Sequence, residues 1–186
     1  GKMIMTVEPK FIPNNAVSIH LQDDLTMKIR LVDCVGYVIE GASGYQDESG
    51  IRLVKTPWYN ESIPFDQAAK IGTKKVIQDH STFGIVLTND GSILDIDERN
   101  YYSATKDIIK ELEDIGKPFI VIVNSKDPSS QHCQSVVEKY RSEYNVPVLA
   151  LDVTNMLESQ IGYLLQEALN EFGINEVKVE VPKYLA

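Results

Sequence analysis

The stretch PFIVIVNSKD, residues 118–127, decides the fold class expected of this chain of 186 residues. Its apolar residues follow Pro118 without a polar interruption until Asn124. A strand with no alternation of apolar and polar residues is buried on both faces, which is typical of a parallel sheet covered by helices. Two further stretches read as buried strands, FGIVLT at 83–88 and VPVLALDV at 146–153. The sequence therefore predicts a mostly parallel sheet.

Segments with helical spacing of apolar residues alternate with these strands. The expected helices cover residues 66–80, 101–115, 130–144 and 157–172. Asp66 is expected to cap the first helix, because a side-chain oxygen at that position can accept from free backbone N–H groups. Gly116 is expected to end the second. Alternating strands and helices indicate an α/β domain with three layers.

Three segments depart from this alternation of strands and helices. Residues 17–22 and 25–32 are expected to form a hairpin that adds an antiparallel edge to the sheet. Residues 37–65, with several glycines and prolines, are expected to be a long irregular insertion. The domain is expected to cover residues 1–173, and residues 174–186 to leave it toward a following domain, because EVKVEV at 176–181 alternates like a strand.

Composition excludes several classes of function. Hydrophobic residues make up 43% of the chain, charged residues 24%, and the net charge is −9, which argues against wholesale binding to nucleic acid or to an anionic membrane. No apolar run approaches the ~20 residues of a membrane span, and no signal peptide is visible. The three histidines lack metal-ligand spacing, and Cys34 and Cys133 are expected to be reduced thiols.

Polar side chains follow the ends of the expected strands. They are Asp33, residues 88–91 (TNDG), residues 124–127 (NSKD) and residues 152–155 (DVTN). Turns favour these residue types, so each group also has an explanation in turn chemistry. In open α/β sheets, however, ligands bind beyond the carboxyl ends of the strands.

The order of these groups is that of a P-loop GTPase-type domain read from its middle. A hairpin is followed by D-x-x-G at Asp33–Gly36, and later an apolar strand ends in Asn-x-x-Asp at Asn124–Asp127. In that layout Asp33 holds Mg²⁺, usually through water, and the Gly36 N–H faces the terminal phosphate. Asn124 and Asp127 would face the base.

One motif of this layout is missing from the sequence. A phosphate-cradling G-x-x-x-x-G-K-[ST] loop occurs nowhere in the 186 residues, and Gly1-Lys2 is followed by Met3. The strand that should precede the loop is missing too. The chain is therefore interpreted as the later part of a P-loop NTPase-like domain that lacks the first strand and the phosphate loop.

Four stretches carry a resemblance to a known family. GKMIMTVEPKFIPN (1–14), IRLVDCVGY (29–37), TPWYNESIPFDQAAKIGTKKVIQDHST (56–82) and KPFIVIVNS (117–125) resemble the stage IV sporulation protein A family. Its members are spore-coat morphogenetic ATPases of endospore-forming bacteria, in the translation-factor-related class of P-loop proteins. The resemblance covers nearly the whole chain, and the long insertion makes it specific.

The resemblance implies an activity, a place and partners. It implies Mg²⁺-dependent hydrolysis of ATP and self-assembly into a homopolymer that forms the basement layer of the spore coat. That layer lies on the outer forespore surface, in the mother-cell cytoplasm. A small amphipathic membrane-anchoring peptide and other spore-coat morphogenetic proteins are implied as partners, without nucleic acid and without a membrane span in this chain.

The resemblance also implies residue roles. Asp33 matches the Walker-B-like acid, and Thr6 matches the first of two adjacent threonines that sense the terminal phosphate. Val7 replaces the second threonine and has no hydroxyl. No position matches the Walker A lysine or its serine or threonine.

Two other functions stay open from the sequence. The chain could be a structural docking module in which nucleotide is incidental, which the missing phosphate loop favours. It could belong to a GTPase, which Asn124 and Asp127 favour, although Ser125 stands where guanine readers usually have lysine. The aromatic residues Trp58, Tyr59 and Phe65 either pin the insertion to the domain or contact a partner.

Overall fold

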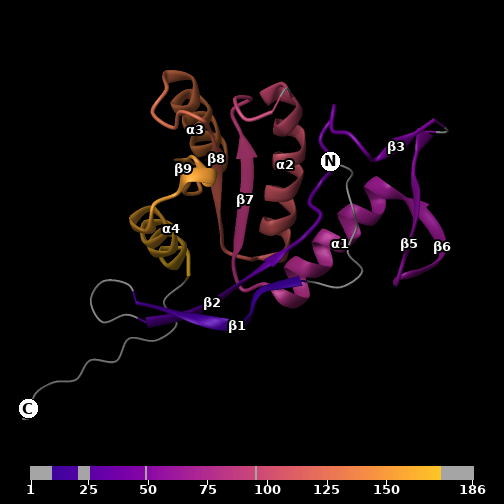
Figure 1. The fold of residues 1–186 in the computed structure, drawn as a ribbon, viewed down its shortest axis with the longest axis horizontal. Helices are drawn as coiled ribbons and strands as arrows, with labels where there is room; N and C mark the ends of the chain where they lie inside the picture. The colour runs from indigo at the N-terminus through magenta and orange to yellow at the C-terminus, as the bar shows by residue number, and fades with distance from the viewer. Residues whose placement is uncertain (1–9, 21–25, 49, 95, 173–186) are drawn as a thin grey trace, which may run out of the picture.

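Three parallel strands form the centre of the fold (Figure 1). The structure is a computed structural model and describes residues 10–20, 26–48, 50–94 and 96–172. The strands pair in the order β7 (Gly84–Asn89), β8 (Phe119–Asn124) and β9 (Val148–Leu151). All three contain predicted strand residues, and their parallel pairing confirms the expected sheet. The last strand is shorter than expected, because residues 153–155 form the 3₁₀ helix η1 (Val153–Asn155).

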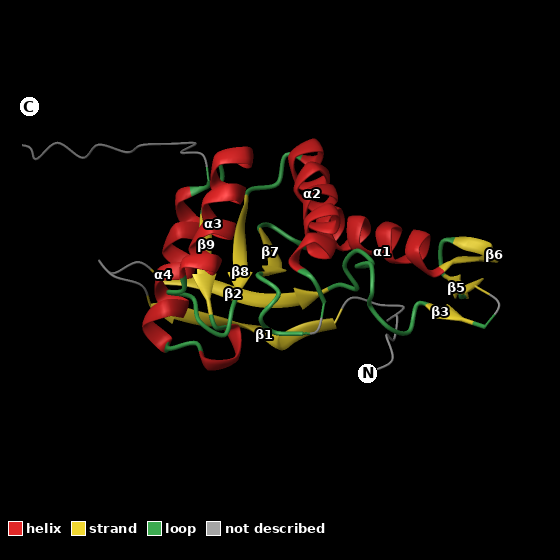
Figure 2. Ribbon diagram, turned by 90° about the horizontal axis from the view of Figure 1, so that it is seen from above, coloured by secondary structure: helices red, strands yellow, loops and turns green. Residues whose placement is uncertain are grey.

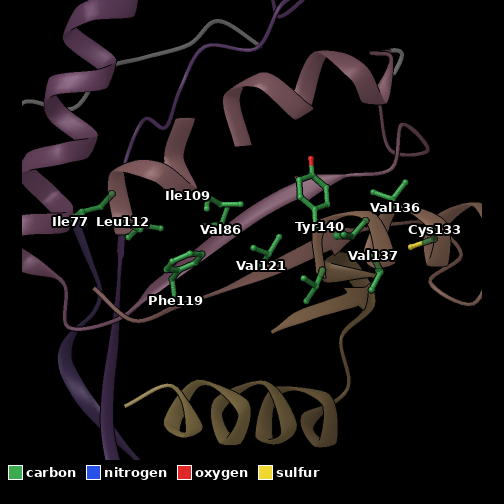
Figure 3. Packing of buried hydrophobic residues seen from close by; sticks show 12 residues of the cluster. Ile77, Val86, Ile109, Leu112, Phe119, Val121, Cys133, Val136, Val137 and Tyr140 are labelled. Carbon is green, nitrogen blue, oxygen red and sulfur yellow. The ribbon is translucent and has the colours of Figure 1, made fainter. Parts of the chain in front are cut away.

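Helices cover both faces of this sheet, which confirms the three layers. α2 (Glu98–Ile115) and α3 (Gln131–Tyr144) lie on one face and α4 (Glu158–Asn170) on the other. Figure 3 shows the larger core, in which side chains of α2 and α3 pack on β7 and β8. A smaller cluster joins α4 to the opposite face through Leu164, Ile120 and Ile122. Gly116 ends α2 with a φ of 71°, as expected for a residue that must adopt the left-handed region.

The helix α1 (Phe65–His80) links the outer part of the chain to this core. Its Ile77 joins the larger core cluster. On the surface, Lys74 Nζ lies 2.5 Å from Glu111 Oε1 of α2. The prediction that Asp66 caps this helix is wrong, because Pro64 occupies the N-cap position and Asp66 lies in the first turn.

The hairpin is longer than expected and forms its own sheet. β1 (Lys10–His20) pairs antiparallel with β2 (Thr26–Asp33), with Lys10 opposite Asp33. Neither strand pairs with the parallel sheet, so the expectation of an antiparallel edge is wrong for the described residues. In Figure 2 the hairpin lies on the same side of the parallel sheet as α4.

The insertion is irregular only over residues 37–45, so the prediction of an irregular segment over 37–65 is wrong for its second part. It contains two small antiparallel pairs, and the helix α1 follows them directly. The prolines do not interrupt these strands, because Pro57 lies in the tight turn between Thr56 and Tyr59, and Pro64 is the last residue of its strand. The four strands are β3 (Gln46–Asp47), β4 (Gly50–Ile51), β5 (Leu53–Thr56) and β6 (Tyr59–Pro64).

Two of the three aromatic residues of the insertion pack on the domain. Phe65 is buried, and its backbone N–H donates to Arg52 O. Trp58 lies against Gly72 of α1, where an added Cβ would meet its ring at 3.2 Å. Tyr59 is exposed. The expected exit at 174–186 lies outside the described residues, and none of the helices described is long and apolar enough to cross a membrane.

Candidate functional site

The predicted site residues fall into two groups at the ends of strands. Asp33 is the last residue of β2 and Gly36 follows it, whereas Asn124 is the last residue of β8 and Asp127 follows it. Thr6 lies outside the described residues. No hydrogen bond recorded among the described residues joins the two groups, and β2 pairs with β1 whereas β7 pairs with β8. The two groups therefore belong to separate sheets.

The first group is a loop held against α1. Asp33 is exposed at the last position of β2. The Gly36 N–H donates to Thr73 Oγ1 at 3.0 Å, and Thr73 is only 1% exposed. Gly36 has a φ of 75°, which side chains rarely adopt, although an added Cβ would meet nothing within 4 Å. The backbone conformation, rather than crowding, therefore requires glycine here.

The neighbours of Gly36 are also fixed. Burial raises the pKa of the Cys34 thiol, although the thiol lies within hydrogen-bonding reach of Gly36 and Thr73. Burial, with the nearby carboxylates Glu111 and Asp107, raises the pKa of Tyr37 to about 12. Both groups are therefore uncharged at neutral pH.

Asn124 connects two strand ends. Its Oδ1 accepts from the Val153 N–H at 3.1 Å, so the side chain ties the end of β8 to η1 after β9. Its backbone carbonyl accepts from the Asp90 N–H at 3.4 Å. Asn124 therefore acts as a link between the loops at the carboxyl edge of the sheet.

Asp127 uses its carboxylate within its own loop. Its Oδ1 accepts from the Ser129 N–H at 3.1 Å and from Ser129 Oγ at 2.6 Å. Its backbone N–H donates to Ser125 Oγ at 3.1 Å. Asp127 itself is exposed. The side chain thus stabilises the turn before α3 in this structure.

A buried carboxylate, Asp90, organises this edge; the sequence placed it in the strand-end group 88–91 but gave it no role of its own. Its side chain accepts from Ser125 Oγ and from Ser92 Oγ, each at 2.5 Å, and from the Ser92 N–H at 3.0 Å. The two serines in turn accept from the backbone N–H groups of Lys126 and Asp127. Asp90 therefore shapes the loop after β8 through two hydroxyl groups.

The charge of Asp90 is stabilised by these partners. Burial by itself would raise the pKa of the carboxyl, since only 3% of Asp90 is exposed, but the hydrogen bonds from Ser125 and Ser92 outweigh it. The pKa of Asp90 consequently lies below its ordinary value. His132 also contacts this region, with Nε2 3.0 Å from Asp90 O and 2.9 Å from Glu98 Oε2. No sequence signal separates this Asp-Gly pair from an ordinary turn.

The residues present fit Mg²⁺ only as part of a shared site. The described residues contain no group of three or more acids, histidines or cysteines that could hold a metal. Asp33 offers one exposed carboxylate, and Mg²⁺ is commonly bound by one or two carboxylates together with substrate phosphates and water. Asp33 therefore fits the role of a single ligand and not of a complete cage.

A cavity of about 360 Å³ lies elsewhere in the molecule. Its walls include Arg141, Pro147, Tyr163 and Glu167, so it opens at the start of β9. The predicted site lies at the opposite ends of the strands. The cavity therefore does not belong to it.

Comparisons with known proteins place the chain in a family. Residues 1–173 match the family described as the ATPase domain of stage IV sporulation protein A. The chain is 50% identical over 185 residues to the stage IV sporulation protein A of Bacillus subtilis (strain 168), and 43% identical to that of Clostridioides difficile (strain 630). Both matches cover 100% of the chain and 38% of the relative.

The chain thus spans less than half of the length of these curated relatives. No solved structure matches it at a significant level. The family match extends from the segment before the hairpin to the end of α4 and includes both groups of strand-end residues. The chain belongs to the family of the stage IV sporulation protein A ATPase domain.

Proposed function

We propose that this chain is the later part of a domain that hydrolyses ATP, in a protein that self-assembles into the basement layer of the bacterial spore coat. Family membership supports the ATPase domain, and the names of the relatives support a role in sporulation. In the proposed function, hydrolysis changes the shape of a scaffold protein through a two-state element that responds to the terminal phosphate.

The observation that carries the proposal is that β7 is an edge strand with exposed apolar side chains. Ile85 and Leu87 are 43% and 56% exposed, whereas their partners in register on β8, Ile120 and Ile122, are buried under α4. Apolar side chains on a parallel strand are normally covered on both faces. In the proposed domain, a first strand that the described residues do not contain would pair with the free edge of β7 and lead into the phosphate loop, next to the exposed Ile85 and Leu87.

Each group at the strand ends then has a role. Asp33 would hold Mg²⁺ through water, and the Gly36 N–H would approach the terminal phosphate. When bound, Mg²⁺ would neutralise charge on the phosphates. Thr6 would sense the terminal phosphate through its hydroxyl. Asn124 would fix the loop after β8 beside the base.

The loop after β8 supports ATP rather than GTP. A guanine-reading carboxylate has to face the two N–H donors of the base, but Asp127 accepts from Ser129 within its own turn. Ser125 has no stem to pack on a base, and its hydroxyl donates to Asp90. The lysine that packs on guanine is thus replaced by Ser125, and the Asp127 carboxylate that would accept from the base already accepts from Ser129.

The remaining parts of the proposal concern the assembled protein. We propose a homopolymer at the outer forespore surface, in the mother-cell cytoplasm. A small amphipathic peptide would anchor it to the membrane, and other spore-coat morphogenetic proteins would bind it. These partners are proposed from the resemblance to the family. The chain covers only 38% of the length of its relatives, so its own structure does not include the surfaces of the rest of the protein.

The test is Mg-ATP hydrolysis by the full-length protein and its Asp33→Ala variant. Asp33 is exposed at a strand end, so its removal costs no core packing. We expect hydrolysis to fall about 10–100-fold, as for residues that support a metal through an outer shell. Asp114→Ala, an exposed acid of α2, serves as the matched control and should leave the rate unchanged. Unchanged hydrolysis in Asp33→Ala, or its unfolding, would contradict the proposal.

A further inference from the structure

The loop that carries Gly36 is bonded to the middle of α1, far away in sequence. The Gly36 N–H donates to Thr73 Oγ1 at 3.0 Å. This bond joins residues 37 positions apart. It is therefore a tertiary contact and not part of a local turn.

The buried position of Thr73 suits it to accept the hydrogen bond from Gly36. It is 1% exposed in the interior of a helix, where threonine is a poor helix former. A buried hydroxyl without a partner costs free energy, so the contact with Gly36 satisfies both groups. The Cys34 thiol is also within hydrogen-bonding reach of the Thr73 side chain. The hydroxyl is thus the polar centre of the contact between loop and helix.

The next residue of the loop is held by the same face of α1. Lys70 Nζ lies 5.2 Å from the centre of the Tyr37 ring. Residues 70 and 73 are three apart in a helix and lie on one face. Lys70 Nζ also lies 3.2 Å from Asp107 Oδ2 of α2. The loop therefore rests on α1 at two successive residues, near the contact of α1 with α2.

A backbone N–H forms one good hydrogen bond at a time. If the terminal phosphate accepts from Gly36, the bond to Thr73 has to break, and the two arrangements exclude each other. A ligand shifts such an equilibrium only by its different affinity for the two states. ADP has no terminal phosphate to compete, so the bond to Thr73 distinguishes ATP from ADP.

We propose that Thr73 is the resting partner of the Gly36 N–H, and that ATP binding transfers this N–H from Thr73 to the terminal phosphate. The inference rests on the proposed ATPase function and adds its regulation. Release of Thr73 would uncouple the Gly36 loop from α1, which follows β6 directly at Phe65. Because the insertion is joined directly to α1, a change in the contact between the Gly36 loop and α1 would reach the insertion first.

The experiment compares ATP and ADP affinities of the full-length protein and its Thr73 variants. Thr73→Val keeps the shape of the side chain but removes the hydroxyl, so the resting state has an unpaired N–H. We expect the ratio of ATP affinity to ADP affinity to rise about threefold to tenfold, the range of one net hydrogen bond. Thr73→Ser keeps the hydroxyl and should remain within about twofold of the wild-type ratio.

Controls separate this role from a structural one. Thr105→Val removes another buried hydroxyl, which donates to Thr88 Oγ1 at 2.9 Å, and should leave the ratio unchanged even if stability falls. Thr73→Ala, which a helix accepts well, replaces Thr73→Val if the latter does not fold. An unchanged ratio in either variant with ATP binding intact, or a rise in Thr73→Ser equal to that in Thr73→Val, would overturn this inference alone. Wild-type protein that binds neither nucleotide would overturn the proposed function as well.

Discussion

Asp90 is the residue whose role depends most on the folded structure. Its carboxylate is almost fully buried and accepts three hydrogen bonds from Ser125 and Ser92. The free energy of these bonds favours the ionised form, because the pKa of Asp90 lies below its ordinary value. A charged acceptor of this kind stabilises the fold by about 1.5–3 kcal/mol for each such bond that would otherwise stay unmade.

This arrangement predicts a dependence of stability on pH. A carboxyl whose pKa is lowered by folding contributes stability that is complete above its unfolded pKa of about 3.9. That stability is lost as the pH falls through the lower folded value. We expect Asp90→Asn to lower the free energy of unfolding by about 2 kcal/mol at pH 7, and the difference from wild type to shrink toward pH 3.

Urea denaturation of both proteins at pH 7, 5 and 3 measures this difference. Asp114→Asn, at an exposed position on α2, is the matched control and should follow the wild type at each pH. A difference between Asp90→Asn and wild type that stays constant from pH 7 to pH 3 would show that shape, and not charge, explains the effect.

Residue roles could be predicted from sequence only where one residue type is required by the backbone. Gly116 was predicted correctly because a helix end in the left-handed region favours glycine. Asp66 was predicted incorrectly as a cap, because the strand β6 ends at Pro64 and the helix starts one residue earlier than the pattern suggests. The buried role of Asp90 depends on Ser125, 35 positions away, which no local pattern reveals.

At the scale of elements, strands that are buried on both faces were the easiest to predict from the sequence. The run before Asn124 has no alternation, so it can only be a strand between two layers. The insertion was harder, because its strands are short and mostly exposed, and among them only β5 alternates in burial. Such strands are held by their turns and by contacts with α1 rather than by a pattern of their own.

The loop between β8 and α3 carries a prediction about nucleotide choice. Asp127 bonds to Ser129, so its carboxylate stabilises the turn and does not read a base. In the full-length protein we expect Asp127→Ala to keep its preference for ATP over GTP within about twofold of wild type, well below the loss of a specific hydrogen bond to a base. Competition binding with ATP and GTP measures the preference, with Asp114→Ala as the control.

Two results would contradict this view of the loop. Wild-type protein that prefers GTP would make Asn124 and Asp127 guanine readers. Loss of that preference in Asp127→Ala would then assign the carboxylate to the base. Lower stability of Asp127→Ala by about 1 kcal/mol is expected in either case, because the turn loses its acceptor for Ser129.

At the scale of the whole molecule, the hairpin β1–β2 and the parallel sheet β7–β8–β9 are separate sheets that do not pair. The hairpin β1–β2 lies on the same side of the parallel sheet as α4 (Figure 2), while Ile85 and Leu87 of β7 remain exposed. Sequence analysis expected one continuous sheet with an antiparallel edge. Among the described residues no strand pairs with both the hairpin and β7, so the hairpin stays separate from the parallel sheet.

The two separated groups of strand-end residues predict that residues 1–186 alone do not hydrolyse ATP. The 186 residues contain no lysine-bearing phosphate loop, and Asp33 and Asn124 are the last residues of strands in different sheets. The isolated segment and the full-length protein are compared for Mg-ATP hydrolysis, with circular dichroism to establish that both are folded.

Amide hydrogen exchange adds an independent measure. The amides of β7 should be better protected in the full-length protein, because a further strand would pair with the free edge of β7. Hydrolysis by the isolated segment, or equal exchange of β7 in the two proteins, would show that the site is completed in some other way.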